Sequence, residues 1–133
     1  MTRRSWRIVL SGLAIVYLAL GGWAAVDASS FGTVVAPFGA ANPHLVRDFA
    51  ACAATFGLGL LIASRRYTWR TPALTLAAIW NGAHAVIHIV DITEAHPFFV
   101  GPLEAALLVF ASALFTTLAL LSARGGSRDH RPQ

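Results

Sequence analysis

The sequence has few of the features on which soluble enzymes and secreted domains depend. Its 133 residues include one cysteine, Cys52, so no disulfide can form within the chain. Lysine is absent, only 12% of the residues are charged, and 56% are hydrophobic. This composition is too apolar for an ordinary soluble domain. There is also no glycine-rich phosphate loop, no Gly-x-Ser-x-Gly motif and no pair of carboxylates at catalytic spacing, so no motif indicates an enzyme.

Four long apolar runs make up most of the chain. They cover approximately residues 6–26, 43–64, 72–91 and 102–123. Each is close to the ~20 residues that cross the ~30 Å hydrocarbon core of a bilayer as a helix. The sequence therefore predicts an all-α fold, a four-transmembrane-helix bundle that forms one membrane domain over residues 1–124, followed by a polar tail at 125–133. The first run exceeds the roughly 7–15 apolar residues of a secretory signal peptide, so we expect a span that is retained.

Proline after a capping side chain marks two helix starts, at Asn42-Pro43 and at Thr71-Pro72. Residues 28–42 contain glycine, proline and apolar side chains, and we expect them to form a loop at the membrane surface. Residues 92–101 are predicted to form a shorter loop on the same side.

The basic residues give the orientation. All ten are arginine, and nine bracket the apolar runs in three clusters: Arg3, Arg4 and Arg7; Arg65, Arg66 and Arg70; Arg124, Arg128 and Arg131. Only Arg47 falls on the opposite side, together with five of the six acidic residues. The positive-inside rule therefore predicts a multi-pass protein of a bacterial plasma (inner) membrane with both termini cytoplasmic. Because the arginines follow the bilayer instead of forming a stripe, we do not expect nucleic acid as a partner.

Residues 80–91 place polar side chains inside the third run. Four of them, Asn81, His84, His88 and Asp91, fall within an arc of roughly 80° at about 100° per residue. Polar and ionisable groups at such depth usually face a bundle interior or an aqueous cavity. At a rise of about 1.5 Å per residue His84 lies past the middle of the membrane, on the outer side. His44, Arg47 and Asp48 of the second run and Glu104 of the fourth lie at a matching level, so we predict one outward-facing polar cluster of these residues.

Several functions are compatible with this cluster. In the first, the side chains form a hydrogen-bonded layer with Arg47 paired to Asp48 or Asp91, and the protein is an accessory or structural subunit that joins a larger membrane complex or associates with itself.

In the second, His84, His88 and Asp91 bind zinc, copper or iron, with His44, Asp48 or Glu104 as a further ligand. Haem suits the pattern less well, because two histidines on one face of one helix cannot ligate opposite faces of a haem. A small proton-coupled transporter would use the same groups, but the inner half of the bundle lacks ionisable residues to continue the path.

One segment also resembles a known family. From Asn42 the chain reads Asn-Pro-His-Leu-Val-Arg-Asp and continues as a small-residue helix that ends Gly57-Leu58-Gly59-Leu60. In a chain of four predicted spans, this segment is similar to the small four-helix bacterial membrane proteins of the DoxX-like kind. The resemblance implies a four-helix fold in the inner membrane, a loose association with respiratory or redox membrane assemblies, and Arg47 as a structural or ligand-contacting position. It implies nothing for the two histidines.

Overall fold

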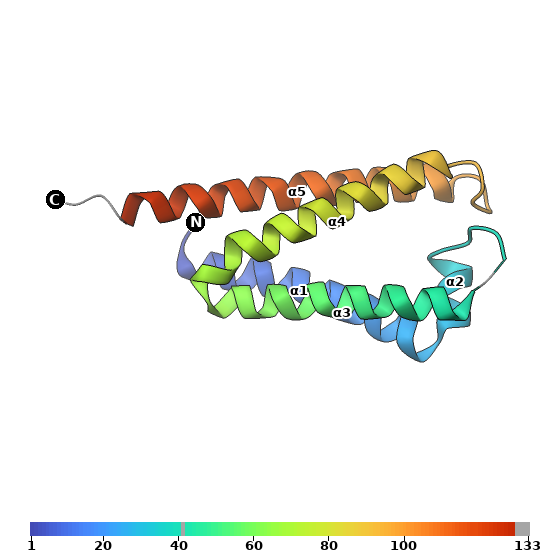
Figure 1. The fold of residues 1–133 in the computed structure, drawn as a ribbon, viewed down its shortest axis with the longest axis horizontal. Helices are drawn as coiled ribbons and strands as arrows, with labels where there is room; N and C mark the ends of the chain where they lie inside the picture. The colour runs from blue at the N-terminus through green and yellow to red at the C-terminus, as the bar shows by residue number, and fades with distance from the viewer. Residues whose placement is uncertain (41, 130–133) are drawn as a thin grey trace.

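The computed structural model describes residues 1–40 and 42–129. Its helices are α1 (Arg3–Val26), α2 (Ala28–Val34), α3 (Pro43–Arg65), the short 3-10 helix η1 (Tyr67–Trp69), α4 (Arg70–Val90) and α5 (Val100–Asp129). Within these residues the one β pairing is an isolated bridge between Phe38 and Ala95. The prediction of an all-α fold with four long helices is confirmed (Figure 1).

The four long helices are apolar on the outside. Four segments are long and apolar enough to cross a membrane: Arg3–Val26, Pro43–Arg65, Tyr67–Val90 and Val100–Gly125. In the most apolar 18-residue stretch of each segment, only 22% is buried inside the protein. Large side chains such as Ile15, Ile79 and Phe110 are 64%, 62% and 66% exposed. So large an apolar surface is unfavourable in water and suits the acyl chains of lipids. The chain is therefore a multi-pass membrane protein.

Capping groups explain where α3 begins, and packing explains where α4 begins. The side chain of Asn42 accepts hydrogen bonds from the N–H groups of His44 and Leu45, and Pro43 occupies the first turn, which confirms the predicted start. The predicted start at Thr71-Pro72 is wrong, because α4 already begins at Arg70. The Thr71 hydroxyl donates to Ser122 Oγ on α5 at 2.9 Å and so joins two helices instead of capping one.

Two further boundaries differ from the prediction. The expected loop at 28–42 contains the short helix α2, whose first turn is capped by the side chain of Asp27 accepting from the N–H of Ser30 at 3.0 Å. Helix α5 runs on to Asp129, so most of the predicted polar tail is helical, and residues 130–133 lie outside the described residues. Helix α5 can continue because no proline occurs between Pro102, in its first turn, and Pro132.

The bundle consists of two antiparallel helical hairpins, α1 with α3 and α4 with α5 (Figure 1). Glycine brings the first pair together. A Cβ atom on Gly21 would lie 3.1 Å from the carbonyl oxygen of Ala50, and one on Gly57 would lie 2.7 Å from Leu18 Cγ. Small residues at such crossings allow helix backbones to approach closely in a membrane. In the second hairpin Ser112 Oγ donates to the carbonyl of Ala78 on α4 at 3.1 Å.

The two hairpins meet mainly at the end that carries the N-terminus and η1. Their shared core includes Leu10, Leu60, Leu74 and Phe115. Arg70 is buried beside it: its Nε donates to the carbonyl of Ala63 at 3.4 Å, and its guanidinium lies over the rings of Trp6 and Tyr67. Towards the other end, Asn81 on α4 donates to the hydroxyl of Tyr17 on α1.

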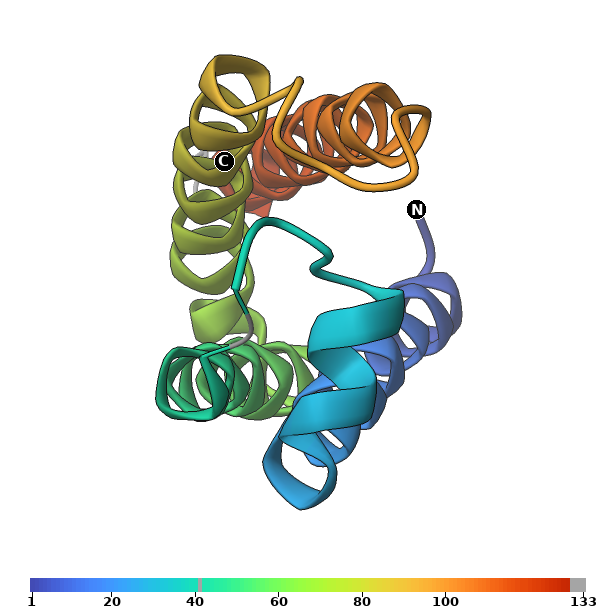
Figure 2. The same cartoon turned by 90° about the vertical axis from the view of Figure 1, so that its right-hand side faces the viewer.

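At the opposite end, which we call the outer end, loops connect the hairpins. Figure 2, viewed from this end, shows the segment after α2 arching across towards the loop between α4 and α5. The bridge between Phe38 and Ala95 is the point of contact, and the N–H of His96 donates to the carbonyl of Pro37 at 3.1 Å. This connection covers the polar residues of α4.

The close approach of α1 and α3 makes Gly21 and Gly22 a matched pair for testing the packing. A leucine at Gly21 would press on the backbone of α3, whereas nothing lies within 4 Å of a Cβ on Gly22. We expect Gly21→Leu to lower the free energy of unfolding by about 1–3 kcal/mol, as overpacking does, and Gly22→Leu to leave it nearly unchanged. Unfolding of the detergent-solubilised protein, followed by circular dichroism, measures both. Equal stabilities of the two variants would contradict the packing described here.

Candidate functional site

Three polar side chains from α4 and α5 meet inside the bundle near the outer end. His84 and His88 lie one turn apart on α4, and their Nε2 atoms face each other at 2.9 Å. On the other side of its ring, His88 Nδ1 lies 3.2 Å from Glu104 Oε2 of α5. The side chains of His88 and Glu104 are only 14% and 17% exposed. We call this arrangement the His84–His88–Glu104 triad.

The contact between His88 and Glu104 determines how the triad is protonated. In the described part of the chain, His88 Nδ1 and Glu104 Oε2 are both buried, and neither has a hydrogen bond, although the two atoms lie 3.2 Å apart. A buried polar atom without a partner is costly, so their 3.2 Å approach favours a proton on Nδ1 facing the carboxylate. His88 Nε2 then carries a lone pair and accepts from the Nε2–H of His84. We infer this tautomer from the partners of each nitrogen.

Aromatic rings enclose the histidines. The ring of His84 meets those of Trp80 and Phe49 edge to face, with centroids 5.6 and 6.2 Å apart. On the inner side, Phe56 packs against Trp80. Tyr17 contacts the rings of Phe56 and Phe115 one layer further in. The inner side of the triad is therefore closed by aromatic side chains, and access from water is left to the outer end.

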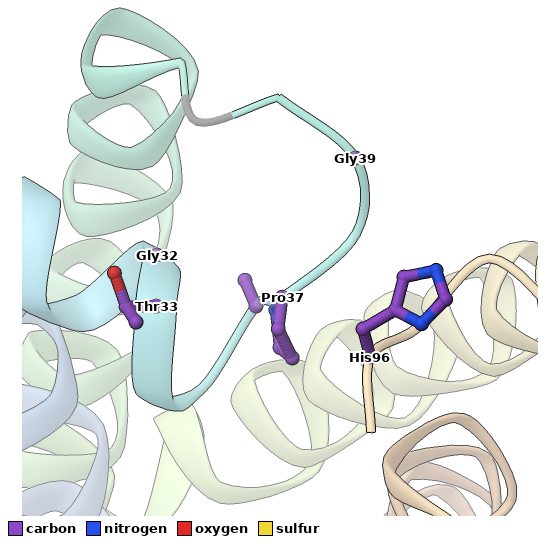
Figure 3. A pocket seen from close by; sticks show the side chains of 6 residues that line it. Gly32, Thr33, Pro37, Gly39 and His96 are labelled. Carbon is purple, nitrogen blue, oxygen red and sulfur yellow. The ribbon is translucent and has the colours of Figure 1, made fainter. Parts of the chain in front are cut away.

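The outer end is covered by residues 35–40, which we call the strap. The ring of Phe38 lies edge to face on the ring of His88, with centroids 4.8 Å apart. Beyond the strap is a pocket of about 270 Å³. Its lining consists of Gly32, Thr33, Ala36, Pro37, Gly39 and His96, from α2, the strap and the loop before α5 (Figure 3). The strap thus contributes to the lining of this pocket and, through Phe38, to the surroundings of the triad.

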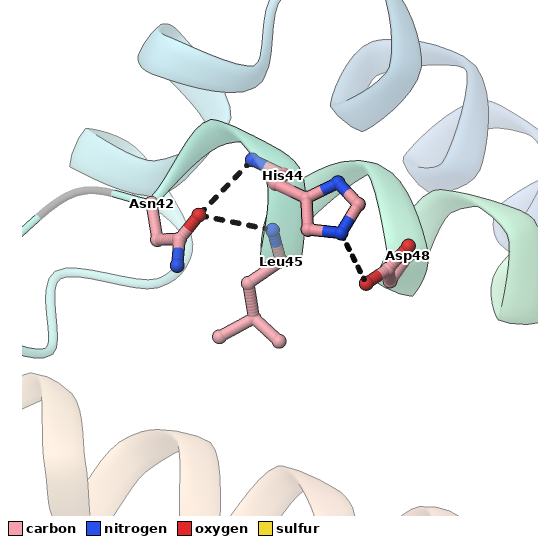
Figure 4. Close-up of polar contacts among 4 residues, drawn as sticks. All are labelled: Asn42, His44, Leu45 and Asp48. Atoms are coloured by element: carbon pink, nitrogen blue, oxygen red, sulfur yellow. Dashed lines mark hydrogen bonds and ion pairs between the residues drawn. The ribbon is translucent and has the colours of Figure 1, made fainter.

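The polar residues predicted on the second span lie apart from the triad. His44 Nε2 is 3.7 Å from Asp48 Oδ2 on the exposed face of α3, where their side chains are 87% and 63% exposed (Figure 4). So exposed an ion pair contributes little to stability. Arg47 is exposed as well, and among the described residues no ion pair joins it to Asp48 or Asp91, so the predicted pairing is not formed. Its role as a ligand-contacting position remains a prediction.

Asn81 and Asp91 take structural positions at the two ends of the predicted polar face. Asn81 is buried and donates to Tyr17 and to the carbonyl of Ala77, its own helix. Asp91 follows the last residue of α4, and its N–H donates to the carbonyl of Ile87 at 2.9 Å.

The predicted metal-ligand set of His44, His84, His88 and Asp91 does not converge. Across residues 1–40 and 42–129, no three His, Cys, Asp or Glu side chains gather around one metal position. His44 is turned to the surface of α3, and Asp91 lies where α4 has already ended. What remains of the set is the pair of imidazoles, with Glu104 behind one of them.

Sequence reasoning missed the aromatic partners and the particular role of Glu104. Glu104 was placed at the correct level, and as the one acidic residue inside the fourth run it already carried a signal, because carboxylates within a span are rarely without a partner. Phe38 and Phe49 carried no such signal, since apolar residues are common throughout this chain. Their roles depend on tertiary contacts.

Comparisons with protein-family models, with curated proteins and with solved structures find no match for this chain. The similarity to DoxX-like proteins therefore remains a prediction, and the chemistry of the triad is argued from its own residues.

Proposed function

We propose that this multi-pass membrane protein binds one transition-metal ion, zinc or copper, between His84 Nε2 and His88 Nε2. The observation that carries the proposal is that these two atoms face each other at 2.9 Å while Glu104 contacts the far nitrogen of His88. Imidazole nitrogens bind zinc at about 2.0–2.1 Å, so two nitrogens on one tetrahedral ion are about 3.3 Å apart. The rings would need to separate by only a few tenths of an ångström.

Glu104 gives the site the second-shell arrangement that metal-binding histidines usually have. A histidine that binds a metal through one nitrogen donates its other N–H to a carboxylate or carbonyl, which fixes the ring and raises its basicity. Glu104 is placed to accept from His88 Nδ1 in this way. Its negative charge also offsets part of the positive charge of an ion held inside the membrane. On metal binding the proton of His84 would have to leave Nε2, with Nδ1 protonated in its place, so that Nε2 is free to bind.

Two protein ligands leave coordination positions open. Glu104 lies on the far side of His88, and among the described residues no group of three His, Cys, Asp or Glu side chains could hold one ion, so water or a small ligand would complete the shell. An incomplete protein shell is typical of sites where ions or ligands exchange, whereas structural zinc sites use four protein ligands. Because aromatic rings close the inner side, the geometry supports binding from the outer side in preference to passage across the membrane.

Orientation and location are part of the same proposal. Six arginines, Arg3, Arg4, Arg7, Arg65, Arg66 and Arg124, are exposed near the end that carries the N-terminus and η1. The positive-inside rule supports a cytoplasmic position for this end in a bacterial plasma membrane. The pocket and the triad would then open to the outside of that membrane. Docking to a larger membrane complex, or self-association, remains a prediction from the sequence.

Cysteine labelling tests this orientation with two exposed threonines. In a Cys52→Ser background, Thr93→Cys places a thiol in the outer loop and Thr68→Cys places one in η1. We expect a membrane-impermeant maleimide to label position 93 in intact bacterial cells and position 68 only after permeabilisation. Labelling of position 68 in intact cells would show that the orientation is the reverse of the one proposed.

Metal content tests the binding site itself. After loading with Zn²⁺ or Cu²⁺ and dialysis, we expect elemental analysis of the detergent-purified protein to find about one ion per chain. His84→Ala and His88→Ala should each remove it, because a single imidazole is left. His44→Ala and His96→Ala are matched controls that should retain the ion, since both residues lie outside the triad. A folded wild-type protein without metal would contradict the proposal.

Competition with a chelator, measured on the same samples, tests whether Glu104 contributes to metal affinity. We expect Glu104→Gln to weaken metal affinity by about 10–100-fold, the usual effect of removing a second-shell partner. Glu94→Gln, at an exposed acidic residue of the outer loop, should leave the affinity unchanged. Equal affinities for the two variants would exclude Glu104 from the site.

A further inference from the structure

We infer that the outer pocket is the entrance to the triad and that the side chain of Phe38 closes it. The inference rests on the proposed function for the identity of what enters, a metal cation, but its geometry is independent of that identity. The strap takes part in both places, because residues on either side of Phe38 line the pocket. Phe38 is the residue of the strap whose ring lies on His88.

The strap presents different residues to its two sides. Pro37 and Gly39 line the pocket, whereas Phe38, between them, contacts the His88 ring at a centroid distance of 4.8 Å. The chain turns here, because the N–H of Phe38 donates to the carbonyl of Ala36 at 2.8 Å. Figure 3 shows the pocket side, with Pro37 and His96 facing the same space. Moving one aromatic ring would therefore connect the pocket with His88.

Few contacts hold the strap in place. In the described residues, one backbone hydrogen bond, from His96 to the carbonyl of Pro37, ties it to the loop between α4 and α5. Directly after Phe38, Gly39 has a φ of +68°, a left-handed conformation that glycine adopts without steric cost. Val35 and Ala36 remain bonded to the carbonyl of Phe31 at the end of α2, so residues 37–40 are the part of the strap that can swing.

The outer end also has the charge that a cation would seek. Five of the six acidic residues lie here: Asp27, Asp48, Asp91 and Glu94 at or near this end, and Glu104 within the triad. Against them stands one arginine, Arg47, and such an excess of negative charge raises the local concentration of cations and their rate of arrival. The lipid-facing sides of α4 and α5 present apolar side chains, and the inner side of the triad is closed by Trp80 and Phe56. The pocket, with Thr33 and His96 in its lining, is the remaining route.

Chemical modification measures access to His88 without any metal. The full chain, purified in detergent, is treated with diethylpyrocarbonate, and the reaction rate of each histidine is followed by mass spectrometry. In the wild type we expect His88 to react much more slowly than His44, whose side chain is 87% exposed. Phe38→Ala should accelerate the reaction of His88 severalfold, and Phe38→Leu should give an intermediate rate.

Phe98→Ala is the matched control, because Phe98 is 83% exposed in the outer loop and should leave His88 unchanged. The rate at His44 should be the same in every sample, and an unchanged helical circular dichroism spectrum shows that each variant is folded. If His88 reacts at the wild-type rate in both Phe38 variants, the entrance is not closed by Phe38 and the inference is wrong. This reaction needs no metal, so the two proposals can fail separately. If His88 reacts faster in the Phe38 variants but the protein binds no metal, only the proposed function is overturned. If the protein binds metal but the reaction rate of His88 is unchanged in the Phe38 variants, only the inference about the entrance is overturned.

Discussion

The contact between His88 and Glu104 is the constraint on which the rest of the account depends. A carboxyl group and an imidazole nitrogen are buried in a domain whose surroundings are lipid, where a polar atom without a partner is costly. Their 3.2 Å approach reduces this cost and at the same time sets which nitrogen of His88 carries the proton. The free nitrogen is then aimed at His84. A single pairing between α4 and α5 thus both stabilises the hairpin and creates two imidazole nitrogens that can act together.

The two hairpins contribute differently to the site. Helices α1 and α3 pack backbone to backbone through Gly21 and Gly57 and supply aromatic rings such as Phe49. Helices α4 and α5 supply every member of the triad. Since the shared core lies mainly towards the inner end, the outer end is joined by loops, where opening costs least. With this division a small bundle can be well packed around Leu10 and Leu74 and still open at the outer end, as the proposed binding of an ion requires.

Much of the fold followed from the sequence because a bilayer leaves few alternatives. Runs of the right length had to be helices, and Asn42 with Pro43 marked a helix start by local chemistry alone. The i, i+4 spacing also placed His84 and His88 on one face. Tertiary contacts decided the rest. Thr71 bonds to Ser122 instead of capping α4, His44 turns to the surface of α3, and Phe38 reaches His88 from a distant loop, and no local pattern encodes such choices.

The protonation of the triad is the most direct test of the central claim, because the proposed binding depends on it. Imidazole ¹⁵N chemical shifts of the histidine-labelled protein in detergent report which nitrogen of each ring carries a proton. The account expects His88 to be protonated on Nδ1, with this preference reduced in Glu104→Gln, and the Nε2 signals of both His84 and His88 to shift on addition of one equivalent of Zn²⁺. A proton on His88 Nε2 in the wild type, or Nε2 signals that do not respond to the ion, would contradict it.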